Sequence, residues 1–299
     1  MQTTVSSQTK DKVPDQRLIS LRFWWILPAS VVFSIIAIAA GISGALFFSP
    51  FFMLAVGLSP ILAVSAGLIT QLFGMVIGLA SYVRQRLVDY QIVKVQLSGA
   101  IPGVIGGAIL AHSVSSQFLH LLFGSGLLVL ALFIYRSQKI KTAHIPDFEG
   151  AEKDMAEHPG EYTRVVTRDG TQFCYRKCPW KPGAVLAITG GFLTGLISAG
   201  LPEISTTQLV TRCKIPAQIA VATSIFVLAI ATAVGVGIYG ATLEIPWEVL
   251  QWSVPGVILG SLLGSRVGKY ISDDMMKKSL TVLFILIGLT VLFVDFLGL

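Results

Sequence analysis

Two long stretches of this chain contain no charged residue, and they constrain the fold more than any other feature. No Asp, Glu, Lys or Arg lies between Arg22 and Arg84, and none lies between Lys94 and Arg136. Only 13% of the 299 residues are charged, whereas 54% are hydrophobic. An apolar run of about 20 residues is long enough to cross a bilayer as a helix. The sequence therefore predicts an all-α polytopic membrane protein.

The basic residues lie in short connections between apolar runs. A formal net charge of +6 would suggest nucleic-acid binding in a soluble protein. In a membrane protein, Lys and Arg in short loops instead set the orientation of the chain. We therefore expect the lipid bilayer as a partner and no nucleic acid.

The apolar runs divide the chain into two halves. A polar tail, 1–23, precedes a first membrane half, 24–136, and a polar linker, 137–182, joins it to a second half, 183–299. Each half begins with an overlong run and continues with three runs of ordinary length. The expected membrane segments are 24–58, 60–83, 92–112, 117–136, 183–211, 216–239, 248–270 and 278–298.

The linker contains an alternating segment and two of the three cysteines. The alternation around Asp169-Gly170 predicts a small β-hairpin with a two-residue turn. Cys174 and Cys178 form a C-x3-C pair, but a zinc site would need more ligands nearby. The third cysteine is Cys213, and we expect the Cys174/Cys178 pair to lie in an ordinary loop, with no metal or redox role and no cofactor.

Charged connections predict which side each part of the protein faces. The basic connection 84–94 and the linker are expected in the cytoplasm, whereas the acidic connection 240–248 and the C-terminus are expected outside. Arg212 and Lys214 also favour the cytoplasm, although the linker before segment 183–211 already lies there. That segment should therefore enter the membrane and return to the same side as two half-helices.

Short motifs recur between the halves. "GLSPILAVSAGL" (57–68) resembles "CKIPAQIAVATS" (213–224), and "SGAIPGVIGGAIL" (98–110) resembles "WSVPGVILGSLL" (252–263). The matched connections are expected on opposite sides of the membrane, so the repeats should be inverted, as in many secondary transporters. Inversion places the N-terminus outside, whereas its basic residues favour the inside, and the sequence leaves that side open.

The overlong run of each half contains glycine, serine and proline. "GISGALFFSP" (41–50) and "GLISAGLPE" (195–203) place Gly44 opposite Gly200 in the repeat. Broken helices persist at membrane depth only where protein or a water-filled cavity receives the freed backbone groups. We expect a broken, re-entrant helical hairpin in each half, with the two breaks facing each other near the midplane.

These motifs resemble the TauE/SafE family of sulfite exporter-like permeases. The resemblance rests on "GISGALFFSP" followed by "SPILAVSAGL", and on "GFLTGLISAGLPEISTTQLV" followed by "IPAQIAVATS". It implies transport of a small sulfur-containing anion such as sulfite or an organosulfonate. The chain departs from the family pattern in its shortened glycine runs and in Thr206, which replaces an expected proline.

The runs around the two breaks contain no Lys or Arg, so neutral donors must replace the hydration shell of an anion. Half-helix N-termini offer free N–H groups, and glycine lets the backbone approach the ligand. The candidate substrate-binding residues are Gly41, Ser43, Gly44, Ser49, Gln71, Ser198, Gly200, Ser205, Thr206, Thr207, Gln208, Thr223 and Ser224.

Glu203 is the only acid between Lys181 and Glu244. A carboxylate at membrane depth is expensive and marks an ion or substrate pathway by default. Desolvation favours its protonated form, so it is the candidate proton carrier. A carboxylate that caps the following half-helix is the alternative.

Other functions remain open or are disfavoured. An anion-selective channel uses similar hairpins, and a small carboxylate is an alternative substrate. No paired-aspartate, H-E-x-x-H or phosphate-loop motif is present in the sequence, so we expect no enzyme. The cell (inner or plasma) membrane is the expected location, and a homo-oligomer remains an option.

Overall fold

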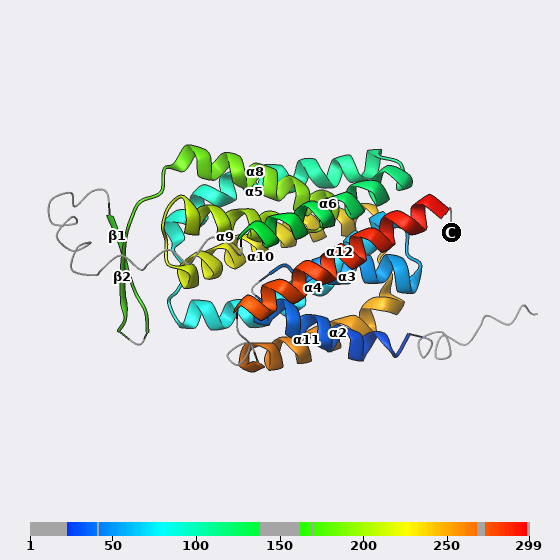
Figure 1. Cartoon of the computed structure of the whole chain (residues 1–299), viewed down its shortest axis with the longest axis horizontal. Helices are drawn as coiled ribbons and strands as arrows, with labels where there is room; N and C mark the ends of the chain where they lie inside the picture. Colours follow the sequence, from blue (N-terminus) through cyan, green and yellow to red (C-terminus); the bar gives the residue numbers. More distant parts are fainter. Residues whose placement is uncertain (1–22, 41, 138–161, 169, 268–272, 298–299) are drawn as a thin grey trace, which may run out of the picture.

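The computed structural model is a bundle of long helices with a two-stranded β-hairpin at one end (Figure 1). It describes residues 23–40, 42–137, 162–168, 170–267 and 273–297. Most of the polar tail, the linker part 138–161, Gly41 and Asp169 lie outside the described residues.

Nearly every described element is helical, as the sequence predicts. The helices and the π-helical turn η1 are α2 (Ile26–Ala40), α3 (Ala45–Phe51), η1 (Phe52–Val56), α4 (Pro60–Arg84), α5 (Tyr90–Ser113), α6 (Ser116–Ser137), α8 (Trp180–Ile197), α9 (Leu201–Thr211), α10 (Ala217–Thr242), α11 (Trp247–Val267) and α12 (Asp273–Leu297). The strands are β1 (Tyr162–Val166) and β2 (Gln172–Arg176).

Three helices are long and apolar enough to cross a membrane by length and composition: α4, α5 and α10. The described parts of α2, α6, α8 and α12, and the combined piece Ala45–Val56, are shorter apolar helices. Both overlong runs of the sequence are therefore divided into shorter pieces.

The first helix of each half packs against a helix of the other half. Helix α8 lies along α5, and α2 lies along α11. A Cβ at Gly103 of α5 would collide with the carbonyl oxygen of Ile188, and one at Gly256 of α11 would meet that of Leu27. Glycine lets the backbones approach closely, as small residues do in membrane helix pairs. The Pro-Gly-Val-Ile motif shared by the halves thus serves the same packing role twice.

Each broken segment folds back on itself. Trp25, before α2, contacts Phe51 at the end of α3, with ring centroids 5.5 Å apart. Cys178, before α8, and Cys213, after α9, have Cα atoms 5.3 Å apart. The start and the end of each hairpin therefore lie at the same end of the bundle.

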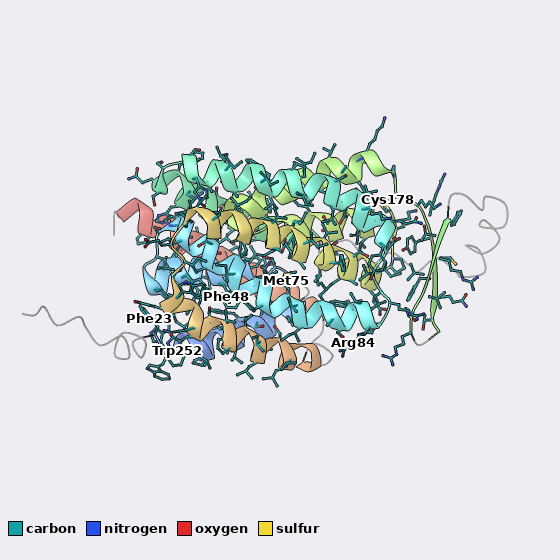
Figure 2. The ribbon with its side chains drawn as sticks, turned by 180° about the vertical axis from the view of Figure 1, so that it is seen from behind. Phe23, Phe48, Met75, Arg84, Cys178 and Trp252 are labelled. Atoms are coloured by element: carbon teal, nitrogen blue, oxygen red, sulfur yellow. A yellow bond between two sulfur atoms is a disulfide. The ribbon has the colours of Figure 1, made fainter. Side chains whose placement is uncertain are left out.

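The two ends of the bundle differ in charge. Figure 2 shows Arg84 and Cys178 near the β-hairpin, and Phe23 and Trp252 at the opposite end. We call the first the basic end, because the helix ends and connections there carry Arg84, Arg86, Lys94, Arg212 and Lys214. We call the second the acidic end, because the connection between α10 and α11 and the first turn of α11 carry Glu244 and Glu248.

The loop of the β-hairpin differs from the predicted two-residue turn. Val166 pairs with Gln172, and Thr167 N donates to the Thr171 carbonyl at 2.9 Å, so the hairpin loop has three residues rather than two. Gly170 has φ +80°, the left-handed conformation that closes such a loop.

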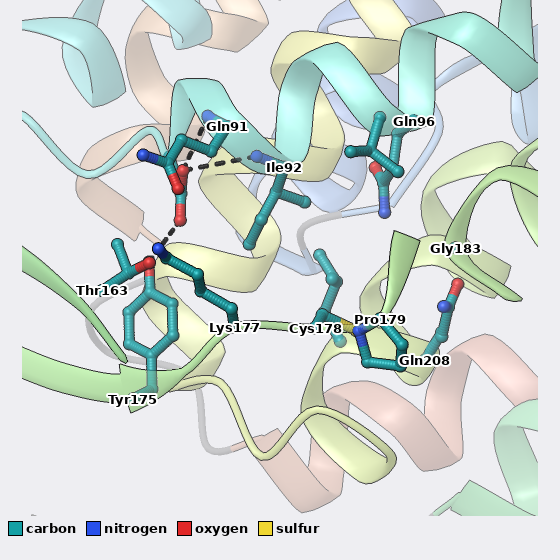
Figure 3. Close-up of a pocket in the computed structure, with 13 residues that line it drawn as sticks. Gln91, Ile92, Gln96, Thr163, Tyr175, Lys177, Cys178, Pro179, Gly183 and Gln208 are labelled. Atoms are coloured by element: carbon teal, nitrogen blue, oxygen red, sulfur yellow. Dashed lines mark hydrogen bonds between the residues drawn. The ribbon is translucent and has the colours of Figure 1, made fainter. Parts of the chain in front are cut away.

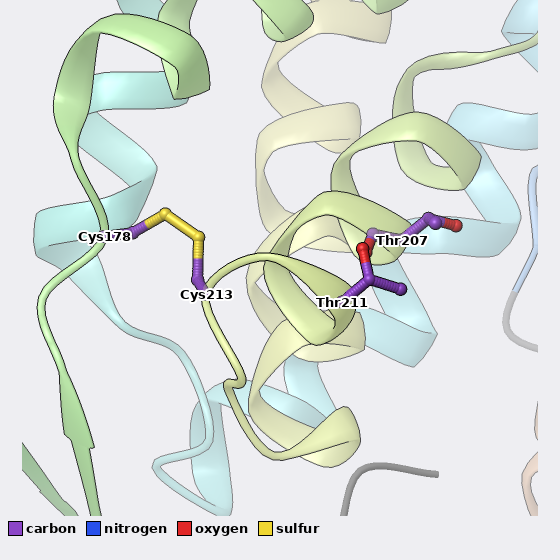
Figure 4. Close-up of a disulfide and its surroundings, with 4 residues drawn as sticks. All are labelled: Cys178, Thr207, Thr211 and Cys213. Carbon is purple, nitrogen blue, oxygen red and sulfur yellow. A yellow bond between two sulfur atoms is a disulfide. The ribbon is translucent and has the colours of Figure 1, made fainter. Parts of the chain in front are cut away.

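The expectation that Cys178 is an ordinary loop residue is wrong, because Cys178 and Cys213 form a disulfide (Figure 4). Their sequence separation of 35 hid this pairing, whereas Cys174, four residues from Cys178, is free and buried.

Candidate functional site

The two helix breaks differ in backbone geometry. Between α8 and α9, Ser198 has φ +57° and Gly200 has φ +117°. The positive φ at Gly200 is accessible to glycine at little cost and strained for other residues. Between α2 and α3, Gly44 is right-handed with φ −64°, and Leu46 N and Phe47 N donate to the carbonyl oxygens of Ser43 and Gly44.

Glu203 joins the two breaks. One carboxylate oxygen, Oε1, accepts a hydrogen bond from Ser43 N of the first break at 3.2 Å. The other, Oε2, accepts from Gly200 N of the second break at 3.1 Å. The side chain is buried. Backbone donors from both halves of the protein thus converge on one carboxylate, and the Gly200 bond fulfils the helix-capping alternative as well.

Gln71 makes a second connection at this crossing. Its Oε1 accepts hydrogen bonds from Ser43 Oγ and from Ala45 N, the first residue of α3. Its Nε2 donates to Thr232 Oγ1 of α10 at 3.4 Å. The buried amide therefore ties the first break to α4 and α10.

Serine hydroxyls complete the cluster. Ser49 Oγ and Ser198 Oγ lie 2.6 Å apart, and Ser43 Oγ, whose proton goes to Gln71 Oε1, lies 3.4 Å from the Ser198 carbonyl oxygen. Gln71 is close to the middle of α4 and Thr232 is close to the middle of α10. We call Ser43, Ser49, Gln71, Ser198, Gly200 and Glu203 the central cluster, and it lies near mid-depth of the bundle.

The remaining candidates are distributed along α9 and α10. Gly44 is half-buried, at the start of α3, and Gly41 is not described. Thr206 is half-buried, and the Thr207 carbonyl accepts from Thr211 at 2.6 Å, near the disulfide (Figure 4). The buried hydroxyls Ser205 Oγ and Ser224 Oγ have no hydrogen-bond partner among the described residues.

Thr223 and Gln208 lie away from the central cluster. Thr223 Oγ1 accepts a hydrogen bond from Asp89 N at 3.1 Å, in the connection between α4 and α5. Gln208 lines a cavity with Asp89 and Tyr175 at the basic end. The candidates predicted as one site therefore occupy two regions.

Asp89 organises the second region and was missed in the sequence. Its Oδ1 caps α5 by accepting from Gln91 N at 2.8 Å and Ile92 N at 3.3 Å. Its Oδ2 accepts from the Tyr175 hydroxyl of β2 at 2.7 Å, which attaches the β-hairpin to the bundle. An aspartate directly before a helix is an N-cap signal that predicts the first role. Nothing in the sequence pairs it with Tyr175.

The Tyr175 hydroxyl stays protonated at this contact. Burial, followed by the charge and the hydrogen bond of Asp89, raises the pKa of Tyr175 far above its ordinary value. Tyr175 therefore acts as a donor to Asp89 across the physiological pH range.

The central cluster can bind an anion in chemical terms. It gathers backbone N–H groups and hydroxyls from both halves around the position of the Glu203 carboxyl group. Such donors bind oxyanions without a Lys or Arg. Broken helices with buried hydrogen-bond donors at mid-depth are typical of secondary transporters. The fold and the central cluster therefore place this protein in the class of membrane transporters.

Similarity to known proteins agrees with this class. The chain matches the family described as "Sulfite exporter TauE/SafE" over residues 26–291, and it belongs to that family. It is 23% identical over 269 residues to the "Probable membrane transporter protein YunE" of Bacillus subtilis (strain 168), covering 88% of this chain and 93% of that protein. No solved structure matches.

Proposed function

We propose that this membrane protein is a secondary transporter that moves a small sulfur-containing anion, such as sulfite or an organosulfonate, with proton coupling. Membership of the TauE/SafE family supports transport in general. The substrate class follows from the family description and from the anion-compatible donors of the central cluster. A small carboxylate as substrate, or an anion-selective channel, is the alternative.

The observation that carries the proposal is the position of the Glu203 carboxylate. Ser43 N and Gly200 N, one from each break, both donate to it. Glu203 thus occupies the place that a substrate anion would take. Two negative groups cannot share these donors at low cost in a poorly hydrated interior, so substrate and ionised Glu203 should exclude each other.

Protonation of Glu203 provides the coupling. A neutral carboxyl accepts hydrogen bonds more weakly than a carboxylate, so protonation releases Ser43 N and Gly200 N for the anion. Glu203 is then neutral while the anion is bound and ionised after it leaves. Each anion would therefore cross together with one proton.

The membrane arrangement is part of the proposal. The two halves, 24–136 and 183–299, would be inverted repeats, because α8 lies along α5 as α2 lies along α11. The N-terminal start of α2 and the end of α12 lie away from the β-hairpin (Figure 1), as inversion requires. The basic end and the linker would face the cytoplasm, with the C-terminus outside the cell membrane.

The test replaces Glu203 with glutamine in proteoliposomes. Ethanesulfonate serves as substrate, because it stays ionised over the working pH range and only the protein can carry the proton. Wild-type protein should accumulate it when driven by a pH gradient alone. Glu203→Gln should abolish that accumulation yet retain counterflow exchange. Glu248→Gln, an exposed acid at the acidic end, is the matched control and should behave as wild type.

Each other outcome points to a different function. Accumulation by Glu203→Gln under a pH gradient alone would make Glu203 a structural cap. Flux without saturable counterflow would favour a channel. Exchange with propionate but not with ethanesulfonate would favour a carboxylate permease.

A further inference from the structure

A cavity of about 120 Å³ lies at the basic end. Helix α5, helix α9, the strand β2 and the segment before α8 enclose it (Figure 3). Gln96 of α5 and Gln208 of α9 belong to its lining, and both side chains are buried. Figure 3 shows Gln96 pointing toward the space bordered by Pro179, with Gln208 on the far side. Because α9 begins directly after Gly200, the cavity lies beside a helix that leads to the central cluster.

Unpartnered polar atoms are concentrated between this cavity and the central cluster, a region that we call the basic half. Among the described residues, six buried side-chain N or O atoms have no hydrogen-bond partner, and five of them lie in the basic half. Gln96 supplies two of these five atoms, and Gln208, Ser205 and Ser224 supply one each. The sixth, Ser30 Oγ, lies near the start of α2, on the acidic side of the central cluster.

Helix geometry places the two serines deeper than the cavity. Ser205 lies one turn from Gln208 on the same face of α9, at a rise of about 4.5 Å toward the second break. It follows Glu203 by two residues. Ser205 and Ser224 lie about 9 and 10 Å from the ends of α9 and α10 that face the basic end, so their depths are similar. The unpartnered atoms thus extend from the cavity to the edge of the central cluster.

The other side of the central cluster is apolar and aromatic. Helix α3 and the turn η1 run from the first break toward the acidic end, where Phe51 contacts Trp25. Phe47, Phe48 and Phe52 are buried along this path, and the rings of Phe48 and Phe52 lie 6.0 Å apart. Apolar constrictions of this kind exclude water. The acidic side of the central cluster is therefore closed to water in this conformation.

Water fits the open atoms of the basic half better than an anion does. Gln96 Nε2 is a donor, Gln96 Oε1 and Gln208 Oε1 are acceptors, and a serine hydroxyl is both. An oxyanion offers only acceptors, whereas water offers donors and acceptors. Buried waters typically make about three hydrogen bonds to polar groups that would otherwise stay unpaired, and a cavity of this volume holds several of them.

We propose that these atoms bind a chain of water molecules that connects the cavity with the central cluster. In this conformation, water and protons then reach Glu203 from the basic end and not from the acidic end. The part played by protons rests on the proposed function, in which Glu203 exchanges a proton during transport. The binding of water does not depend on that function.

The test is radiolytic footprinting of the full chain in lipid nanodiscs. A brief X-ray pulse produces hydroxyl radicals from water, and mass spectrometry locates the side chains that they oxidise. Ser205→Cys places a reactive sulfur in the proposed water chain. Ser30→Cys is the matched control, because Ser30 is also buried and unpartnered among the described residues but lies on the acidic side. The sulfur at position 205 should be oxidised at least tenfold faster than the sulfur at position 30.

Two further variants, made in the Ser205→Cys background, interrupt the water chain. A Cβ at Gly183 would lie 3.6 Å from Gln208 Nε2, so Gly183→Leu extends a side chain into the space beside Gln208 and should slow oxidation at least fivefold. Gly237→Leu, at an exposed position of α10 with no atom within 4 Å, is its control and should leave the rate unchanged. Gln208→Leu removes an acceptor for water and should slow oxidation at least threefold. Melting temperatures establish that the compared proteins are folded.

Two results would overturn the proposal: equal oxidation at positions 205 and 30, or an unchanged oxidation rate in both Gly183→Leu and Gln208→Leu. The readout needs no transport, so it separates this inference from the proposed function. Rapid oxidation at position 205 in a protein without proton-coupled transport would keep the water chain and reject the coupling. Coupled transport with slow oxidation at position 205 would do the reverse.

Discussion

The two helix breaks occupy matching positions in the repeat but differ in backbone geometry. Gly44, at the first break, has φ −64°, and a Cβ there would meet Phe48 at an ordinary 3.5 Å. Gly200, at the second, has φ +117°, and a Cβ there would lie 3.0 Å from Leu193 Cβ. The backbone of the second break therefore requires glycine at position 200, whereas the backbone of the first break can accept another residue at position 44.

The residues three positions after these glycines differ in chemistry. Phe47 is buried against Phe33 and Phe284, with ring centroids 5.9 and 5.6 Å apart. Glu203 stands at the equivalent position of the second half and binds both breaks. The two breaks thus differ in chemistry: the first supplies aromatic packing and a backbone donor, and the second supplies the Glu203 carboxyl group.

The largest expected effect on stability concerns the contact that joins the two ends of each broken helical segment. The Trp25–Phe51 contact closes the first, and the Cys178–Cys213 disulfide closes the second. Cys178→Ser should destabilise the oxidised protein by about 2–4 kcal/mol. Thermal unfolding in detergent measures this, and reductant should lower the wild-type melting temperature to that of the variant. A wild-type melting temperature that does not respond to reductant would contradict the role of the disulfide.

The same cysteines test the proposed orientation. If the basic end faces the cytoplasm, its reducing environment should keep both thiols free in the cell. A membrane-permeant maleimide should then label Cys178 and Cys213 in intact cells, and an impermeant one should not. A disulfide that persists in growing cells would place the basic end outside.

The next largest effect on stability is expected from glycine-to-alanine substitutions at the two breaks. Gly200→Ala should destabilise the protein by about 1–3 kcal/mol, because alanine is strained at this positive φ. Gly44→Ala should change the unfolding free energy by less than about 0.5 kcal/mol, because its backbone is already right-handed. Equal destabilisation by Gly44→Ala and Gly200→Ala would contradict the conclusion that only the second break requires glycine.

The sequence locates the breaks because their signals are local. Gly44, Gly200 and the prolines that begin α4 and precede α10 interrupt otherwise continuous apolar runs, and the motif repeat aligns them. Helix starts and ends consequently lie within a few residues of the predicted segments, except at the breaks. The same local signals identify candidate site residues in or beside the breaks: Ser43, Ser49, Gln71, Ser198 and Glu203.

The contacts at the basic end could not be predicted in this way. Tyr175 reaches Asp89 from a β-hairpin far along the chain, and no helical or strand periodicity records such a pairing. Thr223 was placed at the centre because it follows the repeated motif, yet its hydroxyl accepts from Asp89 N. Motif similarity gives the position of a residue in the repeat, but side-chain direction depends on packing between the halves.

The smallest expected effect compares two serines at matching positions, Ser49 and Ser205. Ser49→Ala removes the hydroxyl bonded to Ser198 Oγ and should cost about 1 kcal/mol of unfolding free energy. Ser205→Ala removes a buried hydroxyl that has no partner among the described residues, so stability should be unchanged or slightly higher. If that hydroxyl donates to the anion, the KM for ethanesulfonate should rise about fivefold, which corresponds to roughly 1 kcal/mol. Thermal unfolding and uptake by proteoliposomes measure the two quantities on the same preparations. A stability loss in Ser205→Ala equal to that of Ser49→Ala, with unchanged KM, would make Ser205 a structural residue and restrict the site to the bonded central cluster.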